Sequence, residues 1–434
     1  MCENISLWND TVSLPSYPEM KSDLKTDVLI IGGGIAGILT AYFLNKNGVD
    51  CVLIEKNKIC SGATSNTTAK ITSQHGFIYS DIIKHSGIES AKAYLKANNL
   101  ALNEYKKMAE SIDCDFEIKD NYVYSSDIEK IEAELVALDK MGYSSDYIEK
   151  LNLPVYTAGG IRFTSQAQFH PFKFINGIIK NLKIYENTFV REVNDNIAVT
   201  DKCKIKAEKI IVATHFPFIN KHGSYFLKQY QHRSYVIAVK TEKLVDGMYV
   251  SNEKDGFSFR NYKDLLIIGS GGHRTGKKGG NYEIIEKLIR NNYADSSIKY
   301  KWATQDCISL DSIPYIGNYS KNTPNLFAIT GFNKWGMTGS MVAAILLKDK
   351  ILGKNNDFFE VFSPSRSILK KQLLINGFES AINLINPIGK RCPHLGCALK
   401  WNKCEHSYDC TCHGSRFDKN GKIIDNPANQ DLTI

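Results

Sequence analysis

Four residues near the C-terminus have the types and the spacing of metal ligands. Cys392 and His394 form a Cys-x-His pair, and after fifteen intervening residues Cys410 and His413 form a Cys-x-x-His pair. Two thiolates and two imidazoles on paired loops can hold two irons that differ in their ligands. A structural zinc ion also uses two cysteines and two histidines. The pattern therefore predicts a metal centre here, with iron favoured because an extra cysteine pair and a His-Gly-Ser tail accompany it.

A glycine-rich turn near the other end of the chain has the features of a dinucleotide site. It spans residues 32–37, follows the apolar run 28–31 and opens a helix; the next apolar run, 51–54, ends at Glu55. Glycines here permit a tight turn, close approach of a pyrophosphate and close packing of helix on strand. Free N–H groups at the helix start hold phosphate charge, and the carboxylate accepts ribose hydroxyls. The expected cofactor-binding residues are Gly32, Gly33, Gly34, Ile35, Ala36, Gly37, Glu55 and Lys56.

Two further loops are expected to reach the same cofactor. Residues 61–76 are small and rich in hydroxyl groups, which suits contacts with phosphate and ribityl oxygens; a solvated loop is the alternative. Residues 331–340 form a second glycine loop that opens a helix. The positive end of that helix would stabilise negative charge on a reduced flavin ring. The expected contacts in the first loop are Ala63, Thr64, Thr67 and Thr68.

The intervening segments must position these loops. Residues 82–149 have the apolar spacing of helices, interrupted by short strands, and are expected to form an inserted domain. Residues 218–305 alternate like antiparallel strands and are expected to carry a substrate pocket. Within them, G-S-G-G-H-R-T-G-K (residues 269–277) is expected to be a glycine turn that presents His273 and Arg274.

Composition limits the classes of function. The chain has 434 residues, 43% hydrophobic and 23% charged, which is ordinary for a soluble protein of two or three domains. The net charge of +8 comes without a basic block interleaved with aromatics, so no nucleic-acid partner is expected. No apolar run is long enough for a transmembrane segment, and the N-terminus lacks the features of a secretory signal. Cysteines scattered through the first 391 residues are typical of a reduced, cytoplasmic protein.

Five segments together resemble the FAD-dependent amine and amino-acid oxidoreductases, a family that includes D-amino-acid oxidase, glycine and sarcosine oxidases and gamma-glutamylputrescine oxidoreductase. The resemblance covers about residues 1–355. It implies an α/β fold with a Rossmann-type, glutathione-reductase-like FAD-binding domain and an α+β antiparallel-sheet substrate domain. The segments are the glycine turn with Glu55, G-A-T-S-N-T-T (62–68), I-V-A-T-H-F-P-F (211–218), D-S-I-P-Y-I-G (311–317) and G-F-N-K-W-G-M-T-G (331–339). The further cofactor contacts that it implies are Val190, Ala213, Thr214, Gly336, Met337, Thr338 and Gly339.

Some members of this family bind flavin covalently through a cysteine or a histidine. Cys307 is the nearest candidate, but its local context, T-Q-D-C-I-S, gives no support. We therefore expect FAD to be bound non-covalently.

The metal-ligand loops, C-P-H-L-G-C (392–397) and C-T-C-H-G-S-R-F (410–417), resemble those of Rieske proteins. The resemblance implies a [2Fe-2S] cluster in which the two cysteines bind one iron and the two histidines bind the other. The implied ligands are Cys392, Cys410, His394 and His413, and the implied disulfide joins Cys397 to Cys412.

Two departures from the Rieske pattern have consequences. Rieske relatives often carry a tyrosine where this chain has Phe417, so one hydrogen bond that raises the cluster potential should be lost. The strands that normally precede the first cluster loop are also missing. A C-terminal module this small should depend on its cluster, its disulfide and packing against the flavoprotein body.

The implied domains are interrupted in sequence. The FAD-binding domain would comprise residues 1–85, 159–217 and 306–358, and the substrate domain residues 86–158 and 218–305. A linker and helix, residues 359–387, would lead to a minimal Rieske [2Fe-2S] module, residues 388–434.

A flavin joined to a one-electron cluster predicts a dehydrogenase. The resemblance implies oxidation of the C–N bond of an amine or amino acid by hydride transfer, with electrons leaving singly to an acceptor protein or a quinone-type acceptor. His273, Arg274 and Lys334 are the predicted substrate-binding or flavin-activating residues; surface charges on glycine turns are the alternative. His75 and His170 fit a structural role equally well. Two other functions stay open: an electron-transfer flavo-iron-sulfur protein without a small-molecule substrate, and a flavin oxidase with a structural metal tail.

Overall fold

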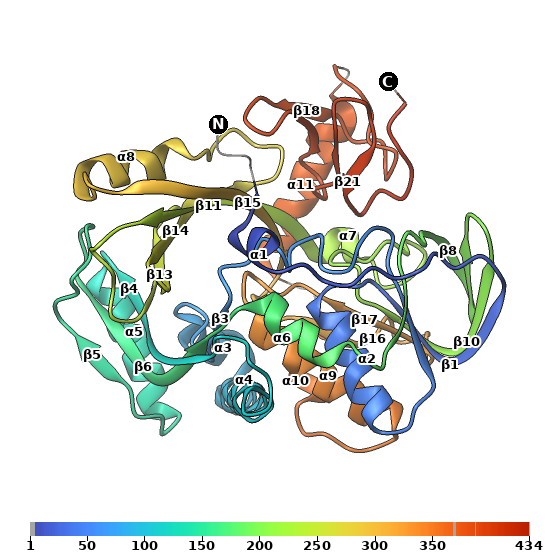
Figure 1. Cartoon of the computed structure of the whole chain (residues 1–434), viewed down its shortest axis with the longest axis horizontal. Coiled ribbons are helices and arrows are strands. Elements are labelled where there is room, and N and C mark those ends of the chain that lie inside the picture. Colours follow the sequence, from blue (N-terminus) through green and yellow to red (C-terminus); the bar gives the residue numbers. More distant parts are fainter. Residues whose placement is uncertain (1–4, 368–369, 387, 434) are drawn as a thin grey trace.

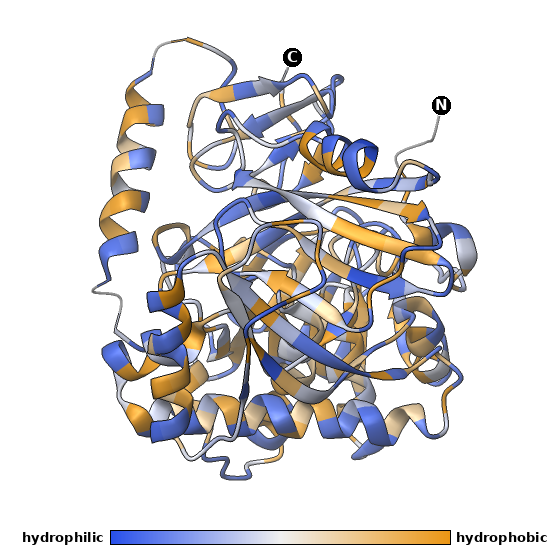
Figure 2. Cartoon of the chain, turned by 90° about the vertical axis from the view of Figure 1, so that its left-hand side faces the viewer, coloured by the Kyte–Doolittle hydropathy of each residue, from blue (hydrophilic) through white to orange (hydrophobic). Residues whose placement is uncertain are grey.

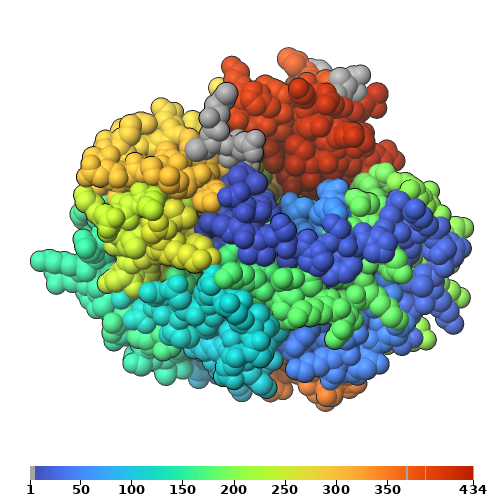
Figure 3. All heavy atoms as spheres, viewed as in Figure 1, coloured from blue at the N-terminus to red at the C-terminus, as the bar shows by residue number. Residues whose placement is uncertain are grey.

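Two large sheets and one small sheet organise the protein. The computed structural model describes residues 5–367, 370–386 and 388–433. Helices pack around the two large sheets, and the small sheet lies at the C-terminal end (Figure 1). In the space-filling view the C-terminal segment forms a lobe seated on the rest of the molecule (Figure 3).

The first sheet contains the strands on either side of the glycine turn. Strands β17, β10, β1, β2 and β7 are parallel, and β16, β9 and β8 extend the sheet in antiparallel pairs. The runs 28–31 and 51–54 are buried on both faces, as expected for a parallel sheet covered on two sides. The bounds are β1 (Leu24–Ile31), β2 (Cys51–Ile54), β7 (Lys183–Tyr185), β8 (Val190–Asn194), β9 (Ile197–Thr200), β10 (Lys204–Val212), β16 (Tyr315–Asn318) and β17 (Leu326–Thr330).

Two helices that begin at glycines pack on this sheet and against each other. α2 (Ile35–Lys46) and α9 (Gly336–Ile351) are apolar on nearly all sides, because both are enclosed between the sheet and neighbouring helices. Their N-termini therefore open toward the same part of the molecule, the edge at which the parallel strands end.

The second sheet is antiparallel except for the pairing of β12 with β4. Its strand order is β15-β11-β14-β13-β12-β4-β6-β3, with β5 paired to β6. The bounds are β3 (Lys70–Ile71), β4 (Glu117–Ser125), β5 (Asp146–Ile148), β6 (Gly159–Gln168), β11 (Gln229–Lys240), β12 (Met248–Ser251), β13 (Ser258–Tyr262), β14 (Leu265–Arg274) and β15 (Ser297–Ser309). The remaining helices of the body are α1 (Leu7–Thr11), α3 (Ile78–Ser86), α4 (Ile88–Ala109), α5 (Ile128–Lys140), α6 (Pro171–Ile178), α7 (Tyr225–Lys228), α8 (Glu283–Asn292) and α10 (Phe359–Phe362).

The second sheet departs from the sequence-based expectation in two places. Most of the glycine-rich segment expected to be a turn belongs to strand β14. This strand pairs with β13 up to Gly269 and with β11 up to Arg274. Strand β6 pairs with β4, so this sheet extends beyond the boundary expected at residue 158. Long-range strand pairing outweighed the local turn signal in the first case.

The C-terminal module consists of a helix and a four-stranded antiparallel sheet. Its buried apolar cluster is small and contains four cysteines together with a few larger side chains. The elements are α11 (Lys371–Ile385), β18 (Leu399–Asn402), β19 (Ser407–Cys410), β20 (Arg416–Phe417) and β21 (Ile423–Asp425).

Candidate functional site

The glycine turn before α2 has no space for side chains at two positions. Gly32 has a φ of +115°, and a Cβ added to it would lie 2.4 Å from the carbonyl oxygen of Ala213. A Cβ on Gly37 would lie 2.0 Å from the carbonyl oxygen of Gly32. The first glycine is required by the backbone conformation and by the neighbouring strand β10, and the second by the contact of α2 with the turn.

The carboxylate of Glu55 is fixed at the end of β2. Its Oε2 accepts a hydrogen bond from the N–H of Gly33 at 2.7 Å, and its Oε1 accepts one from Asn57 at 2.9 Å. Burial raises the pKa of this carboxyl, whereas the two backbone donors act in the opposite direction. The side chain therefore has a fixed orientation at the point where the acidic tip of a dinucleotide site is expected.

A cavity of about 940 Å³ connects the starts of α2 and α9. Its wall contains most of the residues that the sequence predicted to bind the cofactor, from both glycine loops and from the hydroxyl-rich loop between them. The N–H of Ile35 donates to Oγ1 of Thr64, so the hydroxyl-rich loop is held at the start of α2. The predicted residues in the wall are Gly32, Gly34, Ile35, Ala36, Glu55, Lys56, Ala63, Thr64, Thr67, Thr68, Val190, Ala213, Thr214, Gly336 and Met337.

Four predicted cofactor residues lie behind the described cavity wall. Gly33 and Gly37 allow close contacts within the turn, because a Cβ on Gly33 would lie 2.9 Å from the Cβ of Glu55 and one on Gly37 would lie 2.0 Å from the carbonyl oxygen of Gly32. The hydroxyl of Thr338 donates to the carbonyl oxygen of Thr72, and a Cβ on Gly339 would lie 2.7 Å from the ring of Phe332. These positions shape the wall from behind.

Lys334 is the one predicted catalytic residue that lines the cavity. It lies in the turn before α9, where it and Asn333 have positive φ values of 75° and 52°. The turn is held because Oδ1 of Asn333 accepts the N–H of Ser309 at 2.8 Å. Burial lowers the pKa of the Lys334 ammonium, and Asp306 opposes that shift. A Cβ on Gly272 would lie 3.4 Å from its Nζ.

His273 and Arg274, which the sequence predicted to bind substrate or activate the flavin, are not among the described residues of the cavity wall. The His273 ring stacks on Tyr235 with 5.9 Å between centroids. The Arg274 guanidinium donates to the carbonyl oxygens of Thr411 and Cys412, both at 3.1 Å. Because this segment is a strand end and not a turn, its side chains are directed to the core and to the C-terminal module.

Sequence reasoning missed the contribution of β11 to the cavity. Arg233, Ser234 and Tyr235 all line it, although side chains of a regular strand point alternately to opposite faces. The register of β11 against β14 shifts between Arg233 and Tyr235, which brings consecutive side chains to one space. The run of polar residues inside an otherwise apolar strand was the available signal.

Asp306 and Lys70 also line this cavity, and His232 lies close to Lys334 but outside the described wall. Burial raises the pKa of Asp306, and burial together with Arg260 lowers the pKa of Lys70 to about 7. Burial and Lys334 lower the pKa of His232 to about 2, and its Nδ1 has no hydrogen-bond partner among the described residues. His232 is therefore a neutral imidazole with one free nitrogen.

His75 and His170 have structural partners. His75 Nε2 donates to the carbonyl oxygen of Thr72 at 2.7 Å and its Nδ1 accepts from the hydroxyl of Tyr94 at 2.6 Å, while burial lowers its pKa to about 3. Nδ1 of His170 accepts the N–H of Lys173 and so caps α6.

In the module the four predicted metal ligands form two close pairs. Cys392 and Cys410 are buried free thiols joined by a hydrogen bond; that bond, together with backbone N–H groups that point at Cys410, lowers the pKa of Cys410. The Nδ1 atoms of His394 and His413 lie 3.2 Å apart. Burial lowers the pKa of His394 to about 4 and that of His413 to about 3, so both imidazoles are neutral, the form that binds metals. Two sulfur and two nitrogen donors fit an iron pair with mixed ligands.

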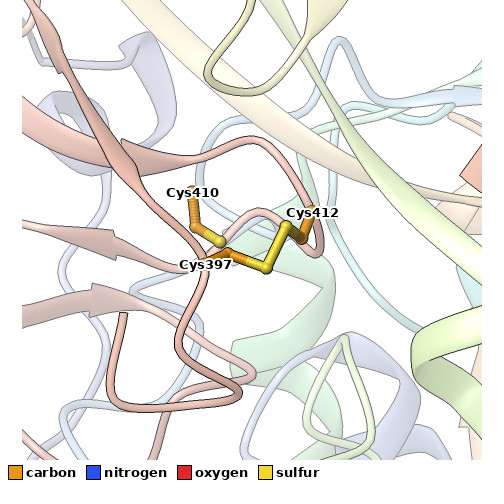
Figure 4. Close-up of side chains that lie close together, drawn as sticks. All are labelled: Cys397, Cys410 and Cys412. Atoms are coloured by element: carbon orange, nitrogen blue, oxygen red, sulfur yellow. A yellow bond between two sulfur atoms is a disulfide. The ribbon is translucent and has the colours of Figure 1, made fainter. Parts of the chain in front are cut away.

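A disulfide joins the two ligand loops. It connects Cys397 to Cys412, and the sulfur of Cys410 lies within 4.8 Å of both (Figure 4). The sulfurs of a disulfide are not thiolates and so do not bind a metal. The Cys397–Cys412 pair instead holds the two ligand loops together next to Cys410.

The module is attached to the body at the cavity. Nδ2 of Asn426 donates to the carbonyl oxygens of Thr214 and Phe216, both at 2.6 Å. Arg191 and Asn429 exchange hydrogen bonds of 2.7 and 3.0 Å through side-chain donors and backbone carbonyls. Because Thr214 and Asn429 both line the cavity, the module closes part of its wall.

A buried ion network strengthens this contact. Arg416 reaches Glu405 at 2.8 Å and Asp409 and Asp425 at 3.0 Å each. Arg233 of the body pairs with Glu405 of the module. The network satisfies charges on both sides of the interface, which buried ions require.

The fold and the two sites define a flavoprotein-type oxidoreductase with an iron-sulfur module. The family model described as "FAD dependent oxidoreductase" (DAO) matches residues 27–350, and the model of the Rieske [2Fe-2S] domain matches residues 368–434. The chain therefore belongs to the DAO family of FAD-dependent oxidoreductases and carries a C-terminal Rieske domain. The Rieske match begins before α11, earlier than the boundary expected at residue 388.

One similar protein matches nearly the whole chain, and two solved structures match about four fifths of it. A Bacillus subtilis protein, YhfW, whose name describes it as a Rieske 2Fe-2S iron-sulfur protein, is 34% identical over 97% of this chain and 95% of its own length. The structure of glycine oxidase from Geobacillus kaustophilus matches 79% of this chain and 99% of its own at 17% identity, with a TM-score of 0.67. L-proline dehydrogenase from P. horikoshii matches 80% and 98% at 18% identity, with a TM-score of 0.66.

These findings confirm two expectations from the sequence. The DAO-family domain binds FAD, and the Rieske domain binds a [2Fe-2S] cluster. Zinc, the alternative ligand of the terminal site, is thereby set aside. Across the described residues, no helix combines the length and apolar character that crossing a membrane requires.

Proposed function

We propose that this chain oxidises the C–N bond of an amine or amino acid and passes the electrons singly to an acceptor protein or a quinone-type acceptor. When bound, FAD supplies a two-electron hydride acceptor and the [2Fe-2S] cluster a one-electron carrier. The other functions of the chain would be to bind both groups, orient the substrate and keep the two sites close together.

The contact between the cavity wall and the second cluster loop carries this proposal. Gln305 lines the cavity, and its Nε2 donates to the carbonyl oxygen of Gly414 at 2.9 Å and to Oε1 of Gln231 at 2.5 Å. Gln231 in turn donates to the carbonyl oxygen of His413 at 3.0 Å. Two buried amides therefore join the flavin-side wall to the backbone of the predicted cluster ligand His413 and of the next residue, Gly414. A structural metal tail has no need of such a connection to the cavity.

The charges around the cavity support an amino acid as substrate. Lys334, which lies in the cavity wall, offers an ammonium to a substrate carboxylate. Glycine oxidase and L-proline dehydrogenase, whose folds are similar, act on amino acids according to their names.

We propose that FAD lies non-covalently in the cavity in the Rossmann-type, glutathione-reductase-like manner. The N-terminus of α2 would meet the pyrophosphate, Glu55 the ribose and the N-terminus of α9 the flavin ring. Burial raises the pKa of the Cys307 thiol well above its usual range, which disfavours a covalent bond at that residue. We retain the expected domain segments, with β6 moved to the substrate domain.

An anaerobic titration of the purified holoprotein tests the function. Flavin absorbance is recorded while amino acids and amines are added one at a time, and the cluster is followed by electron paramagnetic resonance. We expect one class of substrate to bleach the flavin and then produce the signal of the reduced cluster. Reduction by a protein donor alone would favour an electron-transfer protein. Flavin reduction without a cluster signal, followed by rapid reoxidation of the flavin when oxygen is admitted, would favour an oxidase.

A further inference from the structure

Helix α11 is polar on the side that faces the protein and apolar on the side that faces solvent. Its two buried side chains are Asn376 and Asn383. Leu374 is 75% exposed, Phe378 66% and Ile385 80%. In Figure 2 the helix stands at the left-hand edge of the molecule with orange, hydrophobic residues along it. A surface helix normally shows the opposite distribution.

This exposed apolar surface is concentrated. Eight of the eighteen exposed large apolar side chains in the described part of the chain lie between residues 374 and 395. At 100° per residue, those of α11 that are three, four or seven positions apart share one face of the helix. We call this group the α11 stripe: Leu374, Ile375, Phe378, Ile382, Leu384, Ile385, Ile388 and the nearby Leu395.

The inward contacts fix the helix in this orientation. Oδ1 of Asn376 accepts from Arg274 at 3.0 Å and its Nδ2 donates to the carbonyl oxygen of Leu227 at 3.2 Å. Glu379 pairs with Lys277 at 2.7 Å. Turning the stripe inward would break these hydrogen bonds and the ion pair of Glu379 with Lys277, which is costly.

The charges around the stripe have one sign. Lys370 and Lys371 stand at its beginning, and Lys390 and Arg391 follow its end. Glu379, the one acid within α11, is directed inward and paired. Basic residues at the ends of an exposed apolar face complement an anionic surface, and long basic side chains can reach headgroups while their stems lie on apolar groups.

We propose that the α11 stripe binds this protein to the surface of an anionic phospholipid bilayer. The helix of fifteen residues is about 22 Å long and would lie in the plane of the interface. The first cluster loop would come with it, because the N–H of Ala398 donates to the carbonyl oxygen of Asn383 at 2.9 Å and Leu395 is 40% exposed. This inference concerns the surface alone and does not depend on which substrate the cavity takes.

Sedimentation of the holoprotein with vesicles tests the proposal. One set contains equal parts of phosphatidylglycerol and phosphatidylcholine, and the other phosphatidylcholine alone. We expect binding to the anionic set and weaker binding to the neutral set. Phe378→Ser with Ile385→Ser should lower the partition coefficient by more than about tenfold. Lys370→Ser with Lys371→Ser should lower it by roughly fivefold per lysine, on anionic vesicles only.

Ile118→Ser with Val136→Ser is the matched control, since both side chains are 52% exposed on the body and away from α11. Its binding should equal that of the unchanged protein. Flavin absorbance and the cluster signal check that each variant is folded. Absence of binding by the unchanged protein, or equal loss in the control, overturns the proposal. So does light scattering that shows a dimer which Phe378→Ser with Ile385→Ser converts to a monomer without any lipid binding.

Discussion

The two proposed cofactor sites are built from different parts of the chain. At the flavin cavity the decisive features are backbone: a φ of +115° at Gly32, an absent Cβ at Gly37 and the N-termini of α2 and α9. At the cluster site they are side chains, two thiols and two imidazoles, held by loops. A backbone site should fail when an atom is added, and a side-chain site when a ligand atom is removed.

The two regions also differ in what stabilises them. The body has an apolar core that runs through both large sheets and the helices between them. The module has a small buried cluster, a disulfide and the ion network around Arg416. We therefore expect the body to tolerate loss of the cluster better than the module does.

The largest effect is expected from Gly32→Ala, which should abolish FAD binding. The added Cβ meets the carbonyl oxygen of Ala213, and alanine is strained at this φ. The flavin absorbance per mole of purified protein measures the loss. Gly48→Ala is the control, because Gly48 also has a positive φ, +77°, but nothing lies within 4 Å of its added Cβ. If Gly32→Ala retained flavin, or if both Gly32→Ala and Gly48→Ala lost it equally, the backbone of the glycine turn would not be what determines flavin binding.

Cys410→Ser should remove the cluster and leave the flavin bound. A serine hydroxyl is a poor replacement for an iron-bound thiolate, and Cys410 is buried between the two loops. Iron and acid-labile sulfide content should fall to background. Cys404→Ser is the control, since that thiol is exposed and free. Loss of flavin along with iron would mean that the two regions fold as one unit, and would contradict the expectation that the body tolerates loss of the cluster.

Sequence patterns indicated the glycine turn and the cluster loops more directly than the strands of the second sheet that lie between them. The strand, turn and helix around Gly32 are contiguous, and the cluster ligands come in two short pairs, so local spacing was enough. The positions of Arg233 and Asp306 depend on a strand pairing across some seventy residues, which no local pattern contains. The pairing of β14 with the same strand, β11, made residues 269–274 a strand, despite glycines that locally favour a turn. For α11 the periodicity indicated a helix, but not which face the body would cover.

An intermediate effect is expected from Gln305→Met. The substitution keeps the volume of the side chain but removes its hydrogen bonds to Gln231 and Gly414. Both cofactors should remain, while the cluster signal should develop about tenfold more slowly after the flavin is reduced, because the link between the sites is loosened. Rapid-freeze spectroscopy measures this rate. Gln74→Met, at a buried glutamine that bonds to Ile161 within the body, should leave it unchanged.

A smaller effect concerns acid stability of the body. Burial lowers the pKa of His75 to about 3, below the value of about 6.5 for an unfolded chain. Between these values the unfolded state binds the extra proton, so this contribution to stability is present above about pH 6.5 and is lost as the pH falls. Denaturant titrations at several pH values should show that lowering the pH reduces the free energy of unfolding less steeply for His75→Gln than for the unchanged protein. Equal slopes would show that His75 is protonated in the folded state.

The smallest effect should come from Phe417→Tyr, which probes the side-chain site without removing a ligand. Phe417 is fully buried in the same apolar cluster as the four cysteines of the module, at the position where Rieske relatives often carry a tyrosine. A hydrogen bond to a cluster sulfur stabilises the reduced form, and a bond of about 1 kcal/mol corresponds to a rise of roughly 40 mV in a one-electron potential. Redox titration of the cluster signal measures the shift, and the flavin potential serves as the internal control. An unchanged or lowered cluster potential would mean that the missing tyrosine is not what sets the potential of this cluster. The surrounding backbone donors to Cys410 would then be the next groups to vary.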